Sequence, residues 1–63
     1  MSTVKIVVWE ESGGWLGYLQ DYPDYWTQGE TRDDVDANLR DLYADLTRGA
    51  VPSVRKVEDL ELA

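Results

Sequence analysis

Three carboxylates near the middle of the chain, Asp21, Asp24 and Glu30, are the side chains whose type and spacing could support chemistry. Three or more convergent carboxylates can hold two divalent metal ions, as in metal-dependent nucleases. The other interpretation is structural, because Asp is common in turns and beside a turn proline such as Pro23. A nuclease must also bind a polyanion, which a chain of net charge −7 would repel. We therefore expect solvated loop carboxylates, with no resident metal and no cofactor.

Other catalytic chemistries lack their residues in this sequence. The chain contains no His and no Cys, so it offers no triad base, no thiol nucleophile and no imidazole or thiolate metal site. The glycines at Gly13-Gly14 and Gly17 fall in an expected hairpin and not between a strand and a helix, where a phosphate-binding loop would lie. We expect a protein that is not an enzyme.

The segment around Pro23 combines aromatic and acidic side chains and is a candidate contact surface. Aromatic residues on a loop stiffened by proline lose little conformational entropy when a partner docks on them. The alternative is that Tyr22 or Trp26 packs beneath a helix as core; we expect Trp26 to be half-buried, and Tyr22 and Tyr25 to be exposed. The candidate partner-binding residues are Asp21, Tyr22, Asp24, Tyr25, Trp26 and Glu30.

The charge balance indicates which partners the chain can have. Thirteen Asp and Glu oppose six Lys and Arg, so nucleic acid and anionic membrane surfaces are disfavoured and basic proteins are favoured. Simple solubility is the other explanation of an acidic composition. The first residues lack the features of a signal peptide, and no apolar run approaches the ~20 residues of a membrane span, so we expect a cytoplasmic protein.

The length of the chain favours association with another protein. A single domain of 63 residues buries only about 60% of the surface that its unfolded chain exposes. Small domains of this kind usually need a disulfide, a metal or a partner subunit. Because the first two are not expected here, we predict a homodimer or homotetramer, or a complex with a different protein.

The expected elements follow a β-β-β-α-β order. Residues 3–9, 15–20 and 25–28 are rich in β-branched and aromatic residues and predict strands, with a turn at Gly13-Gly14 and a loop over residues 21–24. The second face of the first strand carries Val7 and Trp9, so we expect it to be partly covered. A glycine inside a strand, Gly17, indicates a bulge or the close approach of another group.

A helix is predicted over residues 32–48. Thr31 and Asp34 resemble a capping box, and Asp36 and Arg40 have the spacing of an exposed ion pair. Four residues form one apolar stripe: Val35, Leu39, Leu42 and Leu46. Residues 54–62 are ambiguous, and we expect a fourth strand there. The fold class is therefore α+β, a single domain over residues 1–63 with one helix packed on a small antiparallel sheet.

Residues 21–38 resemble the HicB antitoxin family. The family has a hairpin, a proline-containing loop, a Thr-Gln-Gly-Asp-Thr-type step and an acidic helix start. The matching positions are Gly14, Trp15, Tyr18, Pro23, Thr27, Gln28, Gly29, Thr31 and Asn38. The resemblance covers about residues 3–48 and departs from the family pattern at Asp24-Tyr25, where the family has a Gly-Cys pair.

The resemblance implies a partial ribonuclease-H-like fold and the function of an antitoxin in a type II toxin–antitoxin pair. Its partner would be a HicA-like toxin, a small basic mRNA interferase whose active site the antitoxin covers. The chain would be a short form, without the C-terminal DNA-binding domain of many family members. The alternative is a stand-alone homo-oligomeric adaptor of the same fold that has no toxin partner.

Overall fold

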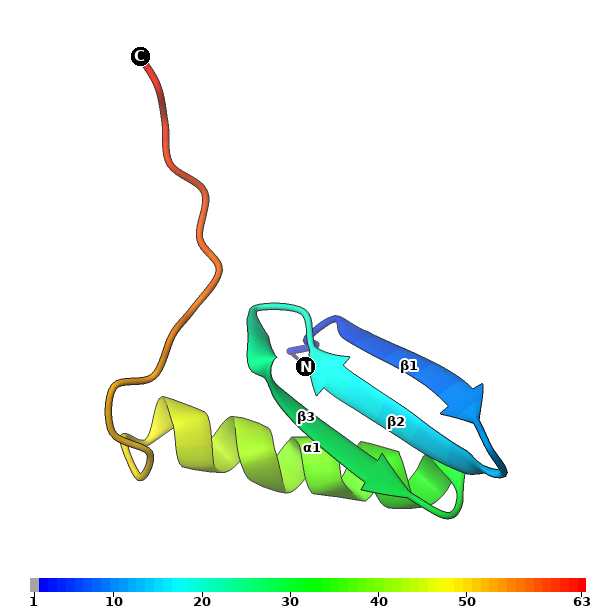
Figure 1. Cartoon of the computed structure of the whole chain (residues 1–63). Helices are drawn as coiled ribbons and strands as arrows, with labels where there is room; N and C mark the ends of the chain where they lie inside the picture. Colours follow the sequence, from blue (N-terminus) through cyan, green and yellow to red (C-terminus); the bar gives the residue numbers. More distant parts are fainter. Residues whose placement is uncertain (1) are drawn as a thin grey trace.

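Within residues 2–63 the chain forms three antiparallel strands and one helix (Figure 1). The computed structural model describes residues 2–63, with strands β1 (Ile6–Glu11), β2 (Gly14–Leu19) and β3 (Tyr22–Gly29) and helix α1 (Arg32–Thr47). The strands lie in the order β1-β2-β3, and α1 crosses one face of the sheet, where it packs on β2 and β3. This arrangement confirms the expected α+β class and the first four elements of the expected order.

A tight hairpin joins β1 to β2. Ser12 and Gly13 both have positive φ, 52° and 79°, as the two central residues of a type I′ turn require. The turn fixes a register in which Ile6 lies opposite Leu19 and Trp9 lies opposite Leu16. The glycine pair at residues 13–14 therefore predicted the hairpin correctly.

The link between β2 and β3 differs from the expected loop over residues 21–24. β3 begins at Tyr22, directly after a short turn at Gln20 and Asp21. The register shifts between Tyr18, which lies opposite Trp26, and Leu19, which lies opposite Tyr22. Residues 23–25 are thus accommodated as a bulge within the strand, and an edge strand with a bulge tolerates a proline that cannot donate a ladder hydrogen bond.

The N-terminus of α1 has the expected cap. The hydroxyl oxygen of Thr31 accepts from the backbone N–H of Asp34 at 3.1 Å, and the Asp34 carboxylate accepts from the N–H of Thr31 at 3.3 Å. The helix ends at Thr47 and the chain reverses at Gly49, which has a φ of 81°. The expected ion pair between Asp36 and Arg40 is wrong, because Asp36 instead bonds Arg32 one turn earlier, at 3.1 Å.

The core lies between α1 and the sheet. Its buried members are Leu19, Tyr22, Val35, Leu39 and Leu46. Leu42, the remaining member of the predicted apolar stripe, packs against this cluster while partly exposed. The helix stripe was thus predicted correctly, whereas the burial of Tyr22 was not.

Gly17 permits the close approach of helix and sheet that its position in a strand suggested. A Cβ at residue 17 would lie 2.9 Å from a methyl carbon of Val35 and 2.9 Å from one of Val8. Both separations are shorter than side chains tolerate, so the glycine sets how closely α1 can pack on β2.

The expected fourth strand over residues 54–62 is absent, and this prediction is wrong. Residues 54–63 form no helix or strand, although Val54 packs against the core and the N–H of Val57 donates to the carbonyl of Asp21 at 2.7 Å. The apolar residues change period along this segment, three apart from Val54 to Leu60 and then two apart to Leu62. Such spacing gives a strand no single apolar face to bury.

Candidate functional site: the open face of the sheet

The sheet has one face covered by α1 and one face without a covering element among residues 2–63 (Figure 1). Successive side chains of a strand point to opposite faces, and the register assigns each residue to one of them. Ile6, Val8 and Leu19 belong to the helix side, where they contact the core. Their neighbours Val7, Trp9 and Tyr18 therefore lie on the other face, which we call the open face.

Three aromatic rings, one from each strand, form a cluster on the open face: Trp9, Tyr18 and Trp26, here called the aromatic triad. Tyr18 stacks on Trp26 with 5.7 Å between ring centroids and 13° between the planes. Trp9 meets both rings edge to face, at 5.1 Å from Trp26 and 6.0 Å from Tyr18. Edge-to-face and offset-stacked pairs are the arrangements that aromatic rings favour, so the triad forms a continuous and mutually supported surface.

Hydrogen bonds fix the two indole rings. The Nε1–H of Trp26 donates to the backbone carbonyl of Pro23 at 2.8 Å, and the Nε1–H of Trp9 donates to a carboxylate oxygen of Glu11 at 3.2 Å. Trp26 still exposes 60% of its surface. The triad therefore presents a large apolar area in a fixed orientation, which lowers the entropy that a partner must overcome on docking.

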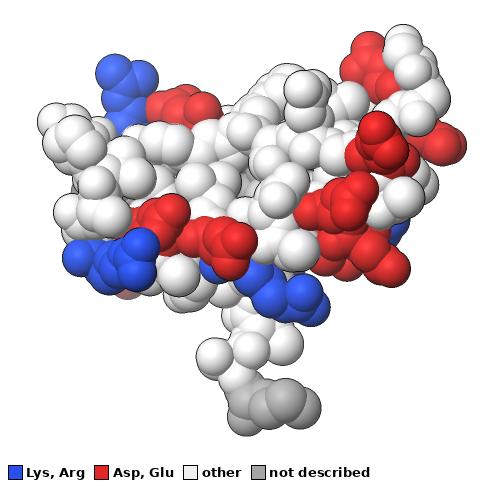
Figure 2. Space-filling view, turned by 90° about the horizontal axis from the view of Figure 1, so that it is seen from below, with Lys and Arg blue, Asp and Glu red and all other residues white. Residues whose placement is uncertain are grey.

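Carboxylates stand at both ends of β3 and so flank the triad. Glu11 and Glu30 border one pocket beside the β1–β2 turn, while Asp21 and Asp24 lie at the other end of β3. Figure 2, seen from the helix side, also shows acidic side chains gathered toward the end of the molecule where α1 begins. The first turn of α1 contains Asp33 and Asp34. The field at that end of the molecule is negative and favours a positively charged partner.

The predicted partner-binding residues fall into different environments. Asp21, Asp24, Trp26 and Glu30 are exposed. Tyr22 is only 7% exposed because its ring packs in the core opposite Leu19, which corrects the expectation that it is exposed. Trp26, expected to be half-buried, is more exposed than that, because it points to the open face.

Tyr25 is half-buried and not exposed as expected. Its ring packs against the core, and its hydroxyl oxygen accepts from the backbone N–H of Arg55 at 3.4 Å. The guanidinium of Arg55 also bonds the carboxylate of Asp24 at 3.4 Å. Tyr25 and Asp24 thus fix the start of the C-terminal segment at Arg55. A partner that binds Tyr25 or Asp24 would therefore compete with Arg55.

The three carboxylates considered for a metal site do not converge. Asp21 precedes β3 and Glu30 follows it, so the length of the strand separates them. Within residues 2–63, the structure shows no group of three potential ligands placed to hold a metal ion. α1, the helix in the same range, is neither long nor apolar enough to cross a membrane.

Sequence reasoning did not identify Trp9 and Tyr18 as surface residues. The signal was present in the hairpin, because a two-residue turn at Ser12-Gly13 fixes which residues of the two strands share a face. Followed through, that register places Trp9 beside Leu16 and Tyr18, on the face opposite Ile6 and Leu19. The contribution of β3 was hidden by the bulge, which shifts the register in a way that the sequence pattern does not reveal.

Comparison with protein-family models, with curated proteins and with solved structures found no match to this chain. The resemblance to HicB antitoxins therefore rests on the sequence motif around residues 21–38.

Proposed function

We propose that this chain is a protein-binding module of the antitoxin type, which acts in the cytoplasm by covering a small basic HicA-like toxin. The observation that carries the proposal is the aromatic triad on a sheet face that no other element of residues 2–63 covers. Trp26 is 60% exposed, Trp9 and Tyr18 are half-buried beside it, and hydrogen bonds fix both indole rings. The open face supplies the contact, and the surrounding carboxylates select a basic partner.

The triad has the composition of a binding hot spot. Trp and Tyr dominate the energetics of protein interfaces, most of all at the centre of a contact surrounded by polar residues. Trp26 lies in the open with Tyr18 stacked on it, and Glu30 lies toward one end of the same strand. A partner that covers the rings would bury apolar area that the isolated chain leaves in water, which is the main favourable term in such complexes.

Charge supports a basic partner. The net charge of −7 and the carboxylates at both ends of β3 would steer a basic protein toward the open face and repel nucleic acid. Masking a basic ribonuclease in this way would require no catalytic group on the antitoxin.

The test begins with the gene that neighbours that of this chain, which the proposal expects to encode a small basic protein with one His. Co-expression of the chain should relieve the growth arrest that this protein causes, and calorimetry should show a tight complex of the two purified proteins. Trp26→Ala should weaken the complex about 30-fold or more, which corresponds to the ~2 kcal/mol of a hot-spot residue. Tyr43→Leu is the matched control, because it removes an exposed aromatic ring from α1, on the other side of the sheet.

The outcomes separate the antitoxin from its alternative. Growth rescue that Trp26→Ala abolishes and Tyr43→Leu preserves supports the proposal. A neighbouring basic protein that neither binds nor is silenced overturns it, as does rescue that is unaffected by loss of the triad. Absence of any such neighbouring gene would favour the stand-alone homo-oligomeric adaptor instead.

A further inference from the structure

β1 is an edge strand, and its outer hydrogen-bonding groups have no partner strand within residues 2–63. The N–H of Gln20 donates to the carbonyl of Lys5 at 2.9 Å. These two residues continue the β1–β2 ladder, and in it they form a hydrogen-bonded pair. Bonded and non-bonded pairs alternate along an antiparallel ladder, so Val7 and Trp9 also bond β2. The backbone groups of Ile6, Val8 and Glu10 therefore point away from the sheet and are free to pair with another strand.

The opposite edge of the sheet is protected. The side-chain amide of Asn38 on α1 donates to the backbone carbonyl of Gln28 on β3 at 3.2 Å. Pro23 lacks a backbone N–H, and the bulge at residues 23–25 interrupts the same edge. An added strand would therefore meet its best template at β1.

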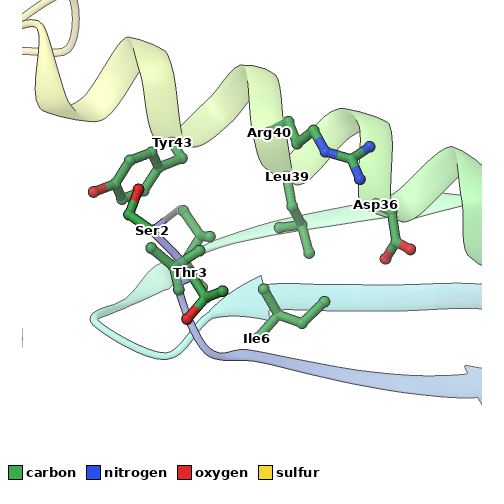
Figure 3. A pocket seen from close by; sticks show the side chains of 9 residues that line it. Ser2, Thr3, Ile6, Asp36, Leu39, Arg40 and Tyr43 are labelled. Atoms are coloured by element: carbon green, nitrogen blue, oxygen red, sulfur yellow. The ribbon is translucent and has the colours of Figure 1, made fainter.

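A groove lies on the helix side of the sheet at the start of β1, between Ile6 and α1, and residues 2–4 also line it (Figure 3). It exists because α1 packs on β2 and β3, and its volume is about 480 Å³. Its apolar lining includes Ile6, Leu19 and Leu39. Two charged side chains also line it: Asp36, which is bonded to Arg32, and Arg40, which makes no ion pair with residues 2–63.

The C-terminal segment has the chemistry that fits this groove and edge. Leu60 and Leu62 are 83% and 87% exposed, and they would share one face of an extended strand on either side of Glu61. Paired with β1, a strand that directs both leucines into the groove directs Glu61 to the open face. Lys5, the residue before β1, lies on that side by the alternation of the strand, and the groove presents Arg40, so the acidic segment meets two cations.

The segment leaves its own sheet before it can reach the groove. Arg55 is held by Asp24 and Tyr25, and Val57 is held by Asp21, all at the end of the sheet. Glu58 and Asp59 still line a pocket with residues 3–5, and beyond them the chain runs away from the strands to the terminus marked C in Figure 1. A segment that is anchored at its stem and directed outward is accessible to a neighbouring molecule.

We propose that residues 58–62 of a second copy add a strand to the free edge of β1, with Leu60 and Leu62 in the groove between β1 and α1. Mutual exchange of the two segments closes a symmetric dimer in which each edge is paired once. The groove lies on the face of the sheet opposite the aromatic triad, so this inference does not rest on the proposed function.

The experiment measures the mass of the purified chain by sedimentation at increasing concentration, together with amide hydrogen exchange. The parent chain should form a concentration-dependent dimer in which the amides of Ile6, Val8 and Glu10 exchange slowly. The double variant Leu60→Asp, Leu62→Asp should be monomeric. Its three amides should lose the protection that the dimer provides and exchange at the rate of the monomer. Val7 and Trp9 bond β2, so their amides should stay protected in both proteins.

Ala63→Asp is the matched control, because it adds the same charge to the segment outside the leucine pair and should leave the dimer intact. Three results would overturn the proposal. The first is a parent chain that stays monomeric and whose amides at Ile6, Val8 and Glu10 exchange fast. The second is slow exchange of these amides in a monomer, which would mean that the chain's own segment fills the groove. The third is a dimer that survives both leucine substitutions, which would place the contact elsewhere.

Discussion

The indole rings of Trp9 and Trp26 meet edge to face, 5.1 Å apart and at 84°, although β2 separates their strands. Tyr18, on the strand between them, stacks against Trp26, and Trp9 contacts both of these rings edge to face. The open face is thus tied across all three strands by side chains that remain accessible to solvent. The same contacts contribute to the stability of the sheet and define its exposed surface.

Replacement of Trp26 by Ala should therefore affect stability as well as binding. Trp26 makes two aromatic contacts, and each contributes about 0.5–1.5 kcal/mol beyond its buried area, so we expect a loss of ~1–3 kcal/mol in the free energy of unfolding. Urea denaturation followed by circular dichroism measures this loss. Trp26→Phe keeps a ring in place and should lose less; equal stability of Trp26→Ala and the parent would show that the triad does not support the sheet.

The carboxylates beside the triad should act on the rate of encounter with a basic partner more than on the lifetime of the complex. Glu30→Gln removes one exposed charge, and we expect a lower association rate and a weaker dependence of that rate on salt. Trp26→Ala should instead raise the dissociation rate. Surface plasmon resonance at several salt concentrations separates the two effects.

The control for this experiment is Asp41→Asn, which removes an exposed charge from the middle of α1. Its effect on the association rate should be smaller than that of Glu30→Gln, because Asp41 lies on the helix and not at the end of β3. Equal effects of the two variants would mean that only the net charge matters and that the partner does not approach the open face.

Gly17→Ala should destabilise the fold by overpacking the interface of helix and sheet. The added methyl group would lie 2.9 Å from Val35 and 2.9 Å from Val8, and insertions of this kind cost about 1–3 kcal/mol. Denaturant unfolding of the variant measures the cost. Gly14→Ala is the control, since its Cβ would approach no atom closer than 3.4 Å. A similar loss in both variants would show that steric overlap at residue 17 is not the cause.

Local signals in the sequence predicted the helix and the hairpin because short-range interactions determine both. Thr31 and Asp34 satisfy the first backbone donors of α1 by themselves, and Gly13 adopts the positive φ that the turn requires. The stripe formed by Val35, Leu39 and Leu46 is buried as its spacing indicated. These features need no knowledge of the rest of the chain.

The errors occurred where pairing between distant residues decides the outcome. Tyr22 is buried because β3 pairs Tyr22 with Leu19 across a bulge, and nothing within residues 21–25 indicates that shift. The C-terminal segment has strand-forming residues, yet a strand also needs a partner edge and one consistent apolar face. The open face was missed for the same reason, because Trp9, Tyr18 and Trp26 are far apart in sequence and meet only in the assembled sheet.

Removal of the capping box should weaken α1 and, with it, the core that the helix covers. Thr31→Ala deletes the acceptor for the N–H of Asp34, and loss of such a cap costs about 0.5–2 kcal/mol. Asp34→Ala deletes the reciprocal acceptor for the N–H of Thr31, so the two losses should not be additive, since each variant already breaks the same local motif. Urea unfolding of both single variants and the double variant measures this coupling.

Asp33→Ala is the control, because Asp33 lies in the same turn but outside the capping box. Its loss of stability should be that of a helix-dipole interaction alone, about 0.3–1 kcal/mol. A loss in Asp33→Ala as large as in Thr31→Ala would assign the effect to charge at the helix start, and strict additivity of the Thr31 and Asp34 variants would show that the two bonds act independently.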